Sequence, residues 1–559
     1  MKKKLCSILL ALTMVLTLLP VSALAEDGTL QSQIDAIEIT GTIILDKSYT
    51  EDISIPKGKA ITLDLNGQTL TNSSGDTITV ALGAELTIKG DGTVDNVTHG
   101  KADIYNNGTV TLSGGRYTRS READNSIDSS GGNSYYNILN HGEMTINKGV
   151  SLISSGHFSS LIASGYYNYT AVEKGERTAY ISATGNAAPK LTINGGTFSG
   201  GINTIKNDDN ATLIINDGTF SNVTQDVIQN NNIATINGGT FNADGCNAFE
   251  NRYYQSGYNA GQLTVTNGNF IGNLLSGDGA TTSIFGGTFS DLSALDYLAD
   301  GANVTIKLAA DTQKDVVIPA NTTVTLNLND QKLTNVSGHT ITNNGKLTVT
   351  GNGTVDNVTH GKGALYNKSG ATAILNGGTF TRSQEAGTYE PYGDNGNSWY
   401  TIQNDGTMTI NAGTTVTTRL NDSGKAVGGY SSLIRNGGNA GTAPTLLING
   451  GHFNGGINTV KNDAGGTLTI KGGDFSNTTQ YVIMNWNIAD IYDGTFEANS
   501  TASAVLFSAS WDGSAGTLNF HGGNVKTTSE SQKAICDYFD ASHTGKVAVS
   551  GGIFTVNPT

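Results

Sequence analysis

The sequence predicts an all-β protein, a right-handed parallel β-helix solenoid with two tandem homologous halves and a short N-terminal helical cap. Glycine accounts for 73 of the 559 residues, about twice its usual share. A Leu-Thr-Ile-Asn-Gly-Gly-Thr-Phe motif recurs with its first turn position at 195, 217, 238 and 267, and the same steps of 22, 21 and 29 residues return at 450, 472, 493 and 522. Such a period indicates stacked coils. A β-sandwich would give turn spacings of about 8 to 12 residues without one motif per coil.

The motif explains why the chain winds into coils. In Leu191-Thr192-Ile193 the two apolar side chains face one side of a short strand and the threonine faces the other. The Asn-Gly-Gly corner requires positive φ, which glycine adopts without strain. A lone coil leaves its strand edges unpaired, whereas stacked coils pair them. We therefore expect an inward phenylalanine ladder and a corner asparagine ladder, formed by Phe198, Phe220, Phe241, Phe270 and Phe289 and by Asn194, Asn216 and Asn237.

Two helical patterns frame the halves. Residues 30–37 are amphipathic and are expected to cap the first coil, as the ends of solenoids require. Residues 291–298 carry a similar pattern at the junction, and we assign residues 26–303 to the first half and 304–559 to the second. The opening strands are expected at residues 42–45 and 60–65, and at 304–308 and 323–328.

The N-terminus has the pattern of a secretory signal peptide over residues 1–25. Three lysines precede an apolar run over residues 5–19, and Ala23-Leu24-Ala25 is a small-residue cleavage site. The run is too short for a comfortable membrane span, and no later segment is longer, so we expect a secreted protein with no membrane insertion. Without the three lysines the chain has 29 basic and 47 acidic residues, a net charge of 29 − 47 = −18. This balance argues against a nucleic-acid partner.

Three sequence features carry a resemblance to a known family. They are the Leu-Gln-x-x-Ile-Asp-Ala cap, the segment over residues 55–70 (Ile-Pro-x-Gly-Lys-x-Ile-Thr-Leu-Asp-Leu-Asn-Gly-Gln-Thr-Leu) and the Asn-Gly-Gly-Thr-Phe coils. Over residues 29–558 the chain resembles the pectate-lyase-like β-helix surface proteins of Gram-positive gut bacteria, which include adhesins and binding proteins. The resemblance implies the architecture more firmly than an activity. Family members often end in a sorting signal or cell-wall-binding repeats. Residues 554–559 show neither, so we expect a released protein, one held by a partner, or a fragment.

The β-helix also hosts polysaccharide lyases and hydrolases, which need paired carboxylates or a metal cluster beside a base. The chain lacks the Arg-x-Pro-x-x-Arg pattern of pectate lyases and the Asp-Asp and Gly-His-Gly patterns of polygalacturonase-like hydrolases. Asp208 and Asp209 form the best acidic pair, but the copy at Asn462 and Asp463 keeps one acid, which favours a solvated turn. We therefore expect no enzyme, no catalytic residue, no metal and no cofactor.

Two sets of duplicated polar residues are interpreted as structural. An acid, an imidazole and an amine recur together and suggest acid–base work, but no nucleophile or metal-ligand spacing accompanies them, so a structural turn is favoured. These residues are Asp95, His99 and Lys101, with their copies Asp356, His360 and Lys362. Arg119 with Glu122, and their copies Arg382 with Glu385, are expected to form exposed ion pairs.

Two long insertions are the predicted binding sites. The step from Gly114 to Gly195 is 81 residues and that from Gly377 to Gly450 is 73, so extra loops must leave the coils there. Exposed tyrosine and tryptophan provide flat contact area with a polar tip. The candidate ligand-binding residues are Tyr135, Tyr136, Tyr166, Tyr167 and Tyr169 in the first half, and Tyr389, Tyr392, Trp399, Tyr400 and Tyr430 in the second.

These observations lead to a functional hypothesis. We expect a secreted or cell-surface adhesin-like protein that binds host or microbial glycans, glycoproteins, or another extracellular protein such as immunoglobulin or matrix. Two alternatives remain open at this point: a polysaccharide lyase or hydrolase on the same fold, and a structural surface-layer protein.

Overall fold

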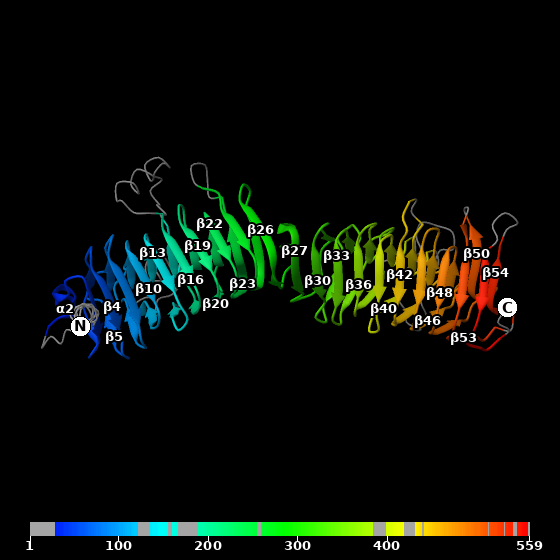
Figure 1. Ribbon diagram of the computed structural model, residues 1–559, viewed down its shortest axis with the longest axis horizontal. Coiled ribbons are helices and arrows are strands. Elements are labelled where there is room, and N and C mark those ends of the chain that lie inside the picture. The colour runs from blue at the N-terminus through cyan, green and yellow to red at the C-terminus, as the bar shows by residue number, and fades with distance from the viewer. Residues whose placement is uncertain are drawn as a thin grey trace, which may run out of the picture. The chain divides into compact units, whose positions relative to one another are not determined.

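The computed structural model describes residues 28–120, 135–154, 159–165, 188–253, 259–383, 399–418, 431–438, 441–511, 514–529, 531–539 and 545–556. The predicted signal peptide, residues 1–25, lies outside this set. The chain divides into two compact units, Met1–Thr288 and Phe289–Thr559. Each unit is a stack of coils, and each coil contributes short strands to three faces (Figure 1). Each strand pairs in parallel with its counterpart in the next coil, so both units are parallel β-helix solenoids.

The strands of the first unit group into three faces. The first face contains β1 (Thr40–Ile44), β4 (Ala60–Asp64), β7 (Glu85–Lys89), β10 (Thr109–Leu112), β13 (Glu143–Ile146), β16 (Lys190–Ile193), β19 (Thr212–Ile215), β22 (Ile233–Ile236), β24 (Gln262–Val265) and β26 (Thr281–Phe289). The second face contains β2 (Tyr49–Thr50), β5 (Thr69–Thr71), β8 (Thr93–Asp95), β11 (Arg116–Thr118), β14 (Ser151–Ile153), β17 (Thr197–Ser199) and β20 (Thr219–Asn222). The third contains β3 (Ile53–Ile55), β6 (Ile78–Val80), β9 (Ile104–Asn106), β12 (Ile138–Asn140), β15 (Ile162–Ser164), β18 (Asn203–Asn207) and β21 (Asp226–Asn230). The long strands β23 (Thr240–Asn251) and β25 (Asn269–Ser276) run through both the second and third faces.

The second unit repeats the arrangement. Its first face contains β27 (Leu298–Lys307), β30 (Thr323–Asn327), β33 (Lys346–Thr350), β36 (Thr372–Leu375), β39 (Thr407–Ile410), β42 (Thr445–Ile448), β45 (Thr467–Ile470), β48 (Ile488–Ile491), β52 (Thr517–Phe520) and β55 (Lys546–Val549). Its second face contains β28 (Thr312–Gln313), β31 (Lys332–Thr334), β34 (Thr354–Asp356), β37 (Thr379–Thr381), β40 (Thr415–Thr417), β43 (His452–Asn454), β46 (Asp474–Asn477), β49 (Thr495–Ala498), β53 (Asn524–Thr527) and β56 (Ile553–Phe554). The third contains β29 (Val316–Ile318), β32 (Ile341–Asn343), β35 (Leu365–Asn367), β38 (Ile402–Asn404), β41 (Ile434–Asn436), β44 (Val460–Asn462), β47 (Ile483–Asn485), β50 (Ala504–Trp511) and β54 (Lys533–Tyr538), with β51 (Ser514–Ala515) antiparallel to β50.

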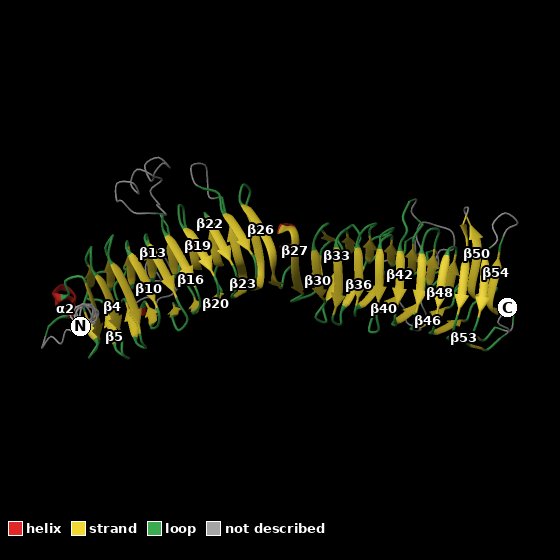
Figure 2. Ribbon diagram, viewed as in Figure 1, coloured by secondary structure: helices red, strands yellow, loops and turns green. Residues whose placement is uncertain are grey.

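The helical segments lie where the sequence predicts them. Helix α2 (Leu30–Ala36) is capped by Thr29, whose hydroxyl accepts from the Ser32 amide at 3.1 Å, and it stands at the start of the first unit (Figure 2). Lys59 Nζ donates to two carbonyl oxygens at the end of α2, which satisfies groups that a helix terminus leaves open. The segment predicted at residues 291–298 is the 3-10 helix η1 (Leu292–Tyr297), with Asp291 as its N-cap.

The predicted inward phenylalanine ladder is confirmed. The rings of Phe198 and Phe220 stack with centroids 4.7 Å apart, Phe220 and Phe241 follow at 4.9 Å, and Phe241 and Phe270 at 4.7 Å. These spacings equal the distance between neighbouring strands of a sheet, so each coil adds one ring. All four rings are buried, as is Phe289. The second unit has its own ladder, in which Phe453, Phe475 and Phe496 stack at 4.5 and 5.0 Å.

The corner asparagine ladder is also confirmed. Asn216 Nδ2 donates to Asn194 Oδ1 at 2.8 Å, and Asn237 Nδ2 to Asn216 Oδ1 at 2.9 Å. Gly196 at the same corner has φ +116°, a conformation that L side chains rarely adopt.

A second asparagine ladder, buried inside the third face, was not predicted. Its members are the asparagines that end the short strands of this face, and the side-chain amide of each one bonds to the next coil. In the second unit Asn367 Nδ2 donates to Asn404 Oδ1 at 2.7 Å, Asn404 to Asn436 at 2.8 Å, and Asn436 to Asn462 at 2.8 Å. Each amide also donates to a backbone carbonyl, as Asn436 does to Thr467 O at 3.1 Å. The side chains are fully buried, so the ladder satisfies polar groups that would otherwise be costly to bury.

The phenylalanine ladder can be tested by truncating one ring. Phe220→Ala should lower the free energy of unfolding of its coils by about 3–5 kcal/mol, because it removes a buried ring and leaves a cavity. Hydrogen exchange of β17, β20 and β23 should show the loss. Val223→Ala, at a side chain that is 63% exposed, is the control and should leave exchange unchanged. Equal protection in the two variants would contradict the inward ladder.

The buried asparagine ladder gives a second test. Asn436→Ala leaves the Asn404 amide and the Thr467 carbonyl without a ladder partner, so we expect a loss of about 2 kcal/mol or more in urea unfolding. Asn411→Ala is the matched control, because Asn411 belongs to the solvent-accessible corner ladder with Asn376 and Asn449. A similar loss for both variants would show that burial does not set the strength of the ladder.

Candidate functional site

Four of the predicted ligand-binding aromatics lie within the described residues. Tyr135 and Tyr136 immediately precede β12, and Trp399 and Tyr400 immediately precede β38. Each pair is in ring contact, with centroids 5.2 Å apart in the first unit and 5.5 Å in the second. The other candidates, Tyr166, Tyr167, Tyr169, Tyr389, Tyr392 and Tyr430, lie outside the described residues.

Buried arginines hold the backbone beneath both aromatic pairs. Arg119 Nη1 donates to the carbonyl oxygen of Tyr135 at 2.8 Å, and its Nε to that of Lys101 at 2.7 Å. Arg382 makes the equivalent bonds to Trp399 and Lys362, both at 2.6 Å. Both arginines are buried, so the expectation that they are exposed is wrong. Their expected partners, Glu122 and Glu385, lie outside the described residues. A guanidinium has five donors in a fixed fork. Here it donates to backbone carbonyl oxygens that the pairing between coils leaves unpaired at the corner.

The duplicated polar turns have a structural geometry. The Asp95 carboxylate accepts from the Ser120 amide at 2.8 Å and from the Ser120 hydroxyl at 2.5 Å, which lies in the next coil. Asp356 accepts the same two bonds from Ser383 and pairs with Lys332 Nζ at 2.9 Å. Both carboxylates therefore link neighbouring coils.

The aromatic pair of the second unit belongs to a larger surface. We call His339, Tyr366, Trp399, Tyr400 and Arg435 the second-unit aromatic face. The ring of His339 lies 5.2 Å from that of Tyr366 and 6.0 Å from that of Trp399, and the Arg435 guanidinium lies 5.1 Å above the Tyr400 ring. Tyr366 and Arg435 are the middle residues of β35 and β41, and the period-two alternation directs such residues away from the core.

Two carboxylates organise this face. Asp405 accepts from the Tyr366 hydroxyl at 2.8 Å and from Gln403 Nε2 at 2.7 Å. Asp463 accepts from Arg435 Nε at 2.8 Å and pairs with Lys461 Nζ at 3.1 Å. Asp405 and Asp463 are both buried, so they orient these side chains in an environment that strengthens hydrogen bonds.

Burial shifts the ionisation of the face. It lowers the pKa of His339 to about 4, assisted by the charges of Lys362, Lys368 and Arg382, so this imidazole is neutral at pH 7. Burial also raises the pKa of Tyr400. Both rings therefore present uncharged aromatic surface at neutral pH.

Two buried polar atoms of the face lack a hydrogen-bond partner among the described residues. They are Gln403 Oε1, on a side chain that is 1% exposed, and the indole Nε1 of Trp399. One is an acceptor and the other a donor. Buried polar atoms are normally paired, so these two stand out as the unsatisfied acceptor and donor of this face among the described residues.

The first unit presents an equivalent surface of different composition. The first-unit aromatic face consists of Tyr105, Tyr135, Tyr136 and His141. The Tyr105 and His141 rings meet at 5.5 Å, and burial lowers the pKa of His141 to about 4. Further along the same third face, in β18, Lys206 Nζ lies 3.2 Å from Asp208 in a buried ion pair.

Asp226 and Glu250 are neighbouring carboxyl groups in β21 and β23 that interact electrostatically. Burial, followed by the charge of Glu250, raises the pKa of Asp226 to about 7. Asn247 Nδ2 donates to Asp226 at 2.8 Å, and Arg252 Nε pairs with Glu250 at 2.7 Å. Asn247 and Arg252 thus occupy part of the hydrogen-bonding capacity of these two carboxyl groups.

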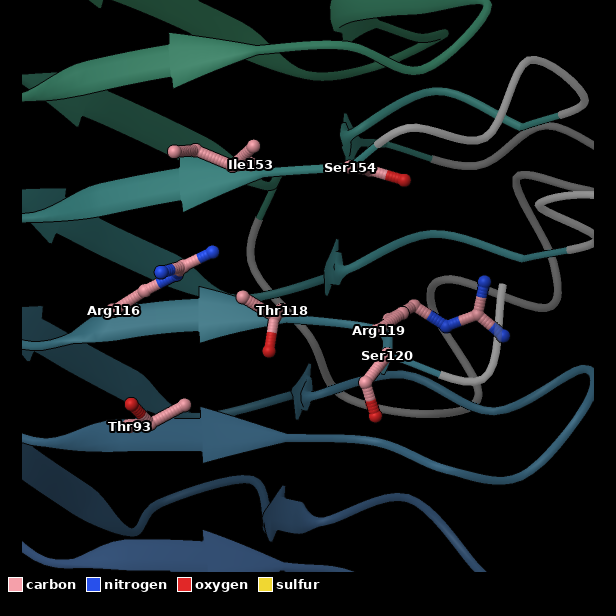
Figure 3. A pocket seen from close by; sticks show the side chains of 7 residues that line it. All are labelled: Thr93, Arg116, Thr118, Arg119, Ser120, Ile153 and Ser154. Carbon is pink, nitrogen blue, oxygen red and sulfur yellow. The ribbon is translucent and has the colours of Figure 1, made fainter. Parts of the chain in front are cut away.

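The described surface also has a shallow pocket of about 330 Å³ on the second face of the first unit. Figure 3 shows its lining by Thr93, Arg116, Thr118, Arg119, Ser120, Ile153 and Ser154. The Arg119 side chain extends away from Thr93 and Arg116 (Figure 3), toward the carbonyls that it binds. The lining has no carboxylate, imidazole or aromatic ring, which makes it a weaker candidate than the aromatic faces.

Comparison with protein-family models, with curated proteins and with solved structures finds no match to this chain. The described residues contain no group of three or more His, Cys, Asp or Glu side chains that could hold a metal ion. Among the same residues, no helix has the length and apolar character needed to cross a membrane.

Sequence reasoning missed several residues of the aromatic faces. Tyr105, Tyr366 and Lys461 lie outside the aromatic-rich insertions, Gln403 and Arg435 lie within one of them but are not aromatic, and none of the five was singled out. The signal that identifies them is the three-residue strand of the third face, which begins with an aliphatic residue and ends with asparagine. The aliphatic residue packs in the core and the asparagine joins the buried ladder, so the middle residue faces outward. The middle residues of successive strands therefore line the aromatic faces.

The Asp226–Glu250 pair predicts a pH dependence. A folded-state pKa of about 7, against the ordinary 3.8, means that the folded state holds more protons between pH 4 and 7, so stability falls as the pH rises through this window. Urea unfolding of the wild type should show that fall, and Asp226→Asn should reduce it. Asp217→Asn, at a half-exposed side chain, should retain the wild-type slope. An unchanged slope in Asp226→Asn would contradict the assignment.

Proposed function

We propose that the protein is a secreted or cell-surface binding protein that recognises glycans, free or carried by host or microbial glycoproteins, through the aromatic faces of its two solenoid units. The observation that carries this proposal is the second-unit aromatic face, where flat rings adjoin a buried acceptor and a buried donor that lack partners among the residues that the structure describes. Secretion is inferred from the pattern of residues 1–25.

The chemistry of the face suits a sugar. The rings of Tyr366, Trp399 and Tyr400 provide apolar area on which the C–H side of a pyranose can pack. Gln403 Oε1 and Trp399 Nε1 complement hydroxyl groups, which both donate and accept. Asp405 and Asp463 hold the neighbouring polar side chains in place, and a preorganised site loses less conformational entropy on binding.

A protein partner such as immunoglobulin or matrix is less favoured. Protein interfaces of stable complexes bury about 800 Å² per partner around apolar anchors. The described rings instead alternate with bonded polar groups over neighbouring coils, which matches a narrow, polar ligand. The same rigid, bonded carboxylates also favour binding over a lyase or hydrolase reaction.

The proposal is tested with the full chain on a glycan array, followed by titration of the best ligand. Trp399→Ala with Tyr400→Ala, and Tyr135→Ala with Tyr136→Ala, should each weaken binding at least tenfold at the affected unit, about 1.4 kcal/mol. Side-chain substitutions are preferable to loop deletions because Arg119 and Arg382 bond to the backbone carbonyls of Tyr135 and Trp399.

The control is Tyr492→Ala, which removes an exposed tyrosine that stacks on His521 away from the aromatic faces. It should bind like the wild type, and all variants should keep the β-rich circular dichroism spectrum. The ligand should be recovered intact, without new reducing or unsaturated ends. Undiminished binding by the variant with all four substitutions, or depolymerisation of the ligand, would refute the proposal.

A further inference from the structure

The two aromatic faces differ most in charge. Equivalent strands follow each aromatic pair, so positions can be matched along the third face. Gln403 of β38 corresponds to Leu139 of β12, and Arg435 of β41 corresponds to Ala163 of β15. Lys461 of β44 corresponds to Lys206 of β18, so the lysine is kept while the arginine is present in the second unit alone.

The arginine adds to the second unit a positive charge that the first unit lacks, while Asp405 places a carboxylate on this face where the first unit has His141. Arg435 and Lys461 share a single carboxylate, Asp463, at 2.8 and 3.1 Å. In the first unit Lys206 Nζ pairs with Asp208 at 3.2 Å. The surplus cation cannot be attributed to composition, because the whole chain has a formal charge of −15.

Further cations surround the same face. Lys368 Nζ lies 4.6 Å from the centre of the Tyr366 ring, and the charges of Lys362 and Arg382 reach His339, whose pKa they help to lower. The first-unit position that matches His339 is Asp76, whose negative charge contributes to raising the pKa of Tyr135. Lys362 and Arg382 have first-unit counterparts in Lys101 and Arg119. The second-unit pair is therefore distinguished by the added cations Arg435 and Lys368, and the first-unit pair by the carboxylate of Asp76.

The position of the Arg435 guanidinium is also fixed by its neighbours. Its Nε is bonded to Asp463 and its plane lies over Tyr400, while no described group accepts a hydrogen bond from its two Nη nitrogens. Gly438, at φ +92°, makes room for it, because a Cβ there would collide with Nη2. A planar guanidinium with two free nitrogens matches the geometry of a carboxylate.

We infer that the two units have diverged in ligand charge, and that the second-unit aromatic face binds an acidic sugar whose carboxylate pairs with Arg435. The sugar ring packs against Trp399 and Tyr400, and its hydroxyls reach Gln403 Oε1 and Trp399 Nε1. The first-unit face, with Ala163 and Leu139 at the matching positions, takes an uncharged sugar. This inference rests on the proposed glycan-binding function and specifies its substrate class.

The test uses the full chain and two matched pairs of probes. Trigalacturonic acid is compared with its fully methyl-esterified form, and sialyllactose with lactose, so that the arms distinguish a uronic acid from a sialic acid. Titration calorimetry of the wild type should give at least tenfold tighter binding for the acidic member of one pair. Arg435→Ala, which installs the first-unit residue, should remove that preference by weakening the binding of the acidic probe to the affinity of the neutral one.

Two further variants keep the result interpretable. Arg435→Gln retains most of the side-chain length and should lose the preference as Arg435→Ala does, which separates charge from packing. Lys471→Ala removes an exposed lysine of the same unit, away from the face, and should keep it. Loss of preference in Lys471→Ala would indicate a general charge effect and overturn the assignment to Arg435.

The outcomes separate the inference from the function on which it rests. Equal affinity of the wild type for acidic and neutral probes, or a preserved preference in Arg435→Ala, would overturn the inference while glycan binding stands. Absence of binding to every sugar on the array and to all four probes would overturn both.

Discussion

The register between neighbouring coils determines which side chains of this protein are buried and which line each face. Parallel backbone pairing sets the spacing, and the buried asparagine ladder fixes the phase, because each amide of Asn367, Asn404 and Asn436 must meet both the next asparagine and a carbonyl. A slip of one residue would turn each amide outward and leave several buried polar groups unpaired. The ladder therefore makes every Ile-x-Asn strand present its middle residue at an equivalent position on the third face.

This constraint leaves the middle residues free to change. The core and ladder residues flank them, so a substitution at the middle position alters the surface without altering the stack. The two units show the result at matching strands. The first unit places Gln229 and Glu250 beside Asp226, whereas the second stacks Tyr481 on Phe507 at 4.5 Å. Functional divergence after duplication is expected to concentrate on this face.

The sequence predicted the periodic features and missed those that depend on several coils at once. The steps of 22, 21 and 29 residues correctly implied the stacking of Phe198 on Phe220 and of Asn216 on Asn194, because one coil repeats the next. The burial of Arg119 could not be predicted in this way, since its carbonyl partners belong to Lys101 and Tyr135, which are separated from it by loops of unequal length. Gln403 and Arg435 were missed because neither is conspicuous until the middle residues of neighbouring strands are aligned.

The local charge of the second-unit face must be weighed against the acidity of the whole chain. At physiological ionic strength the Debye length is about 8 Å, and neighbouring coils stand about 4.8 Å apart. The interaction of a bound ligand with exposed carboxylates more than about two coils away is therefore largely screened. The surplus charge of Arg435 and Lys461 over Asp463 lies within that distance, in partly buried positions where screening is weaker. The net charge thus affects solubility and the approach of a ligand, whereas on the proposed function the residues of three adjacent strands would set the preference for ligand charge.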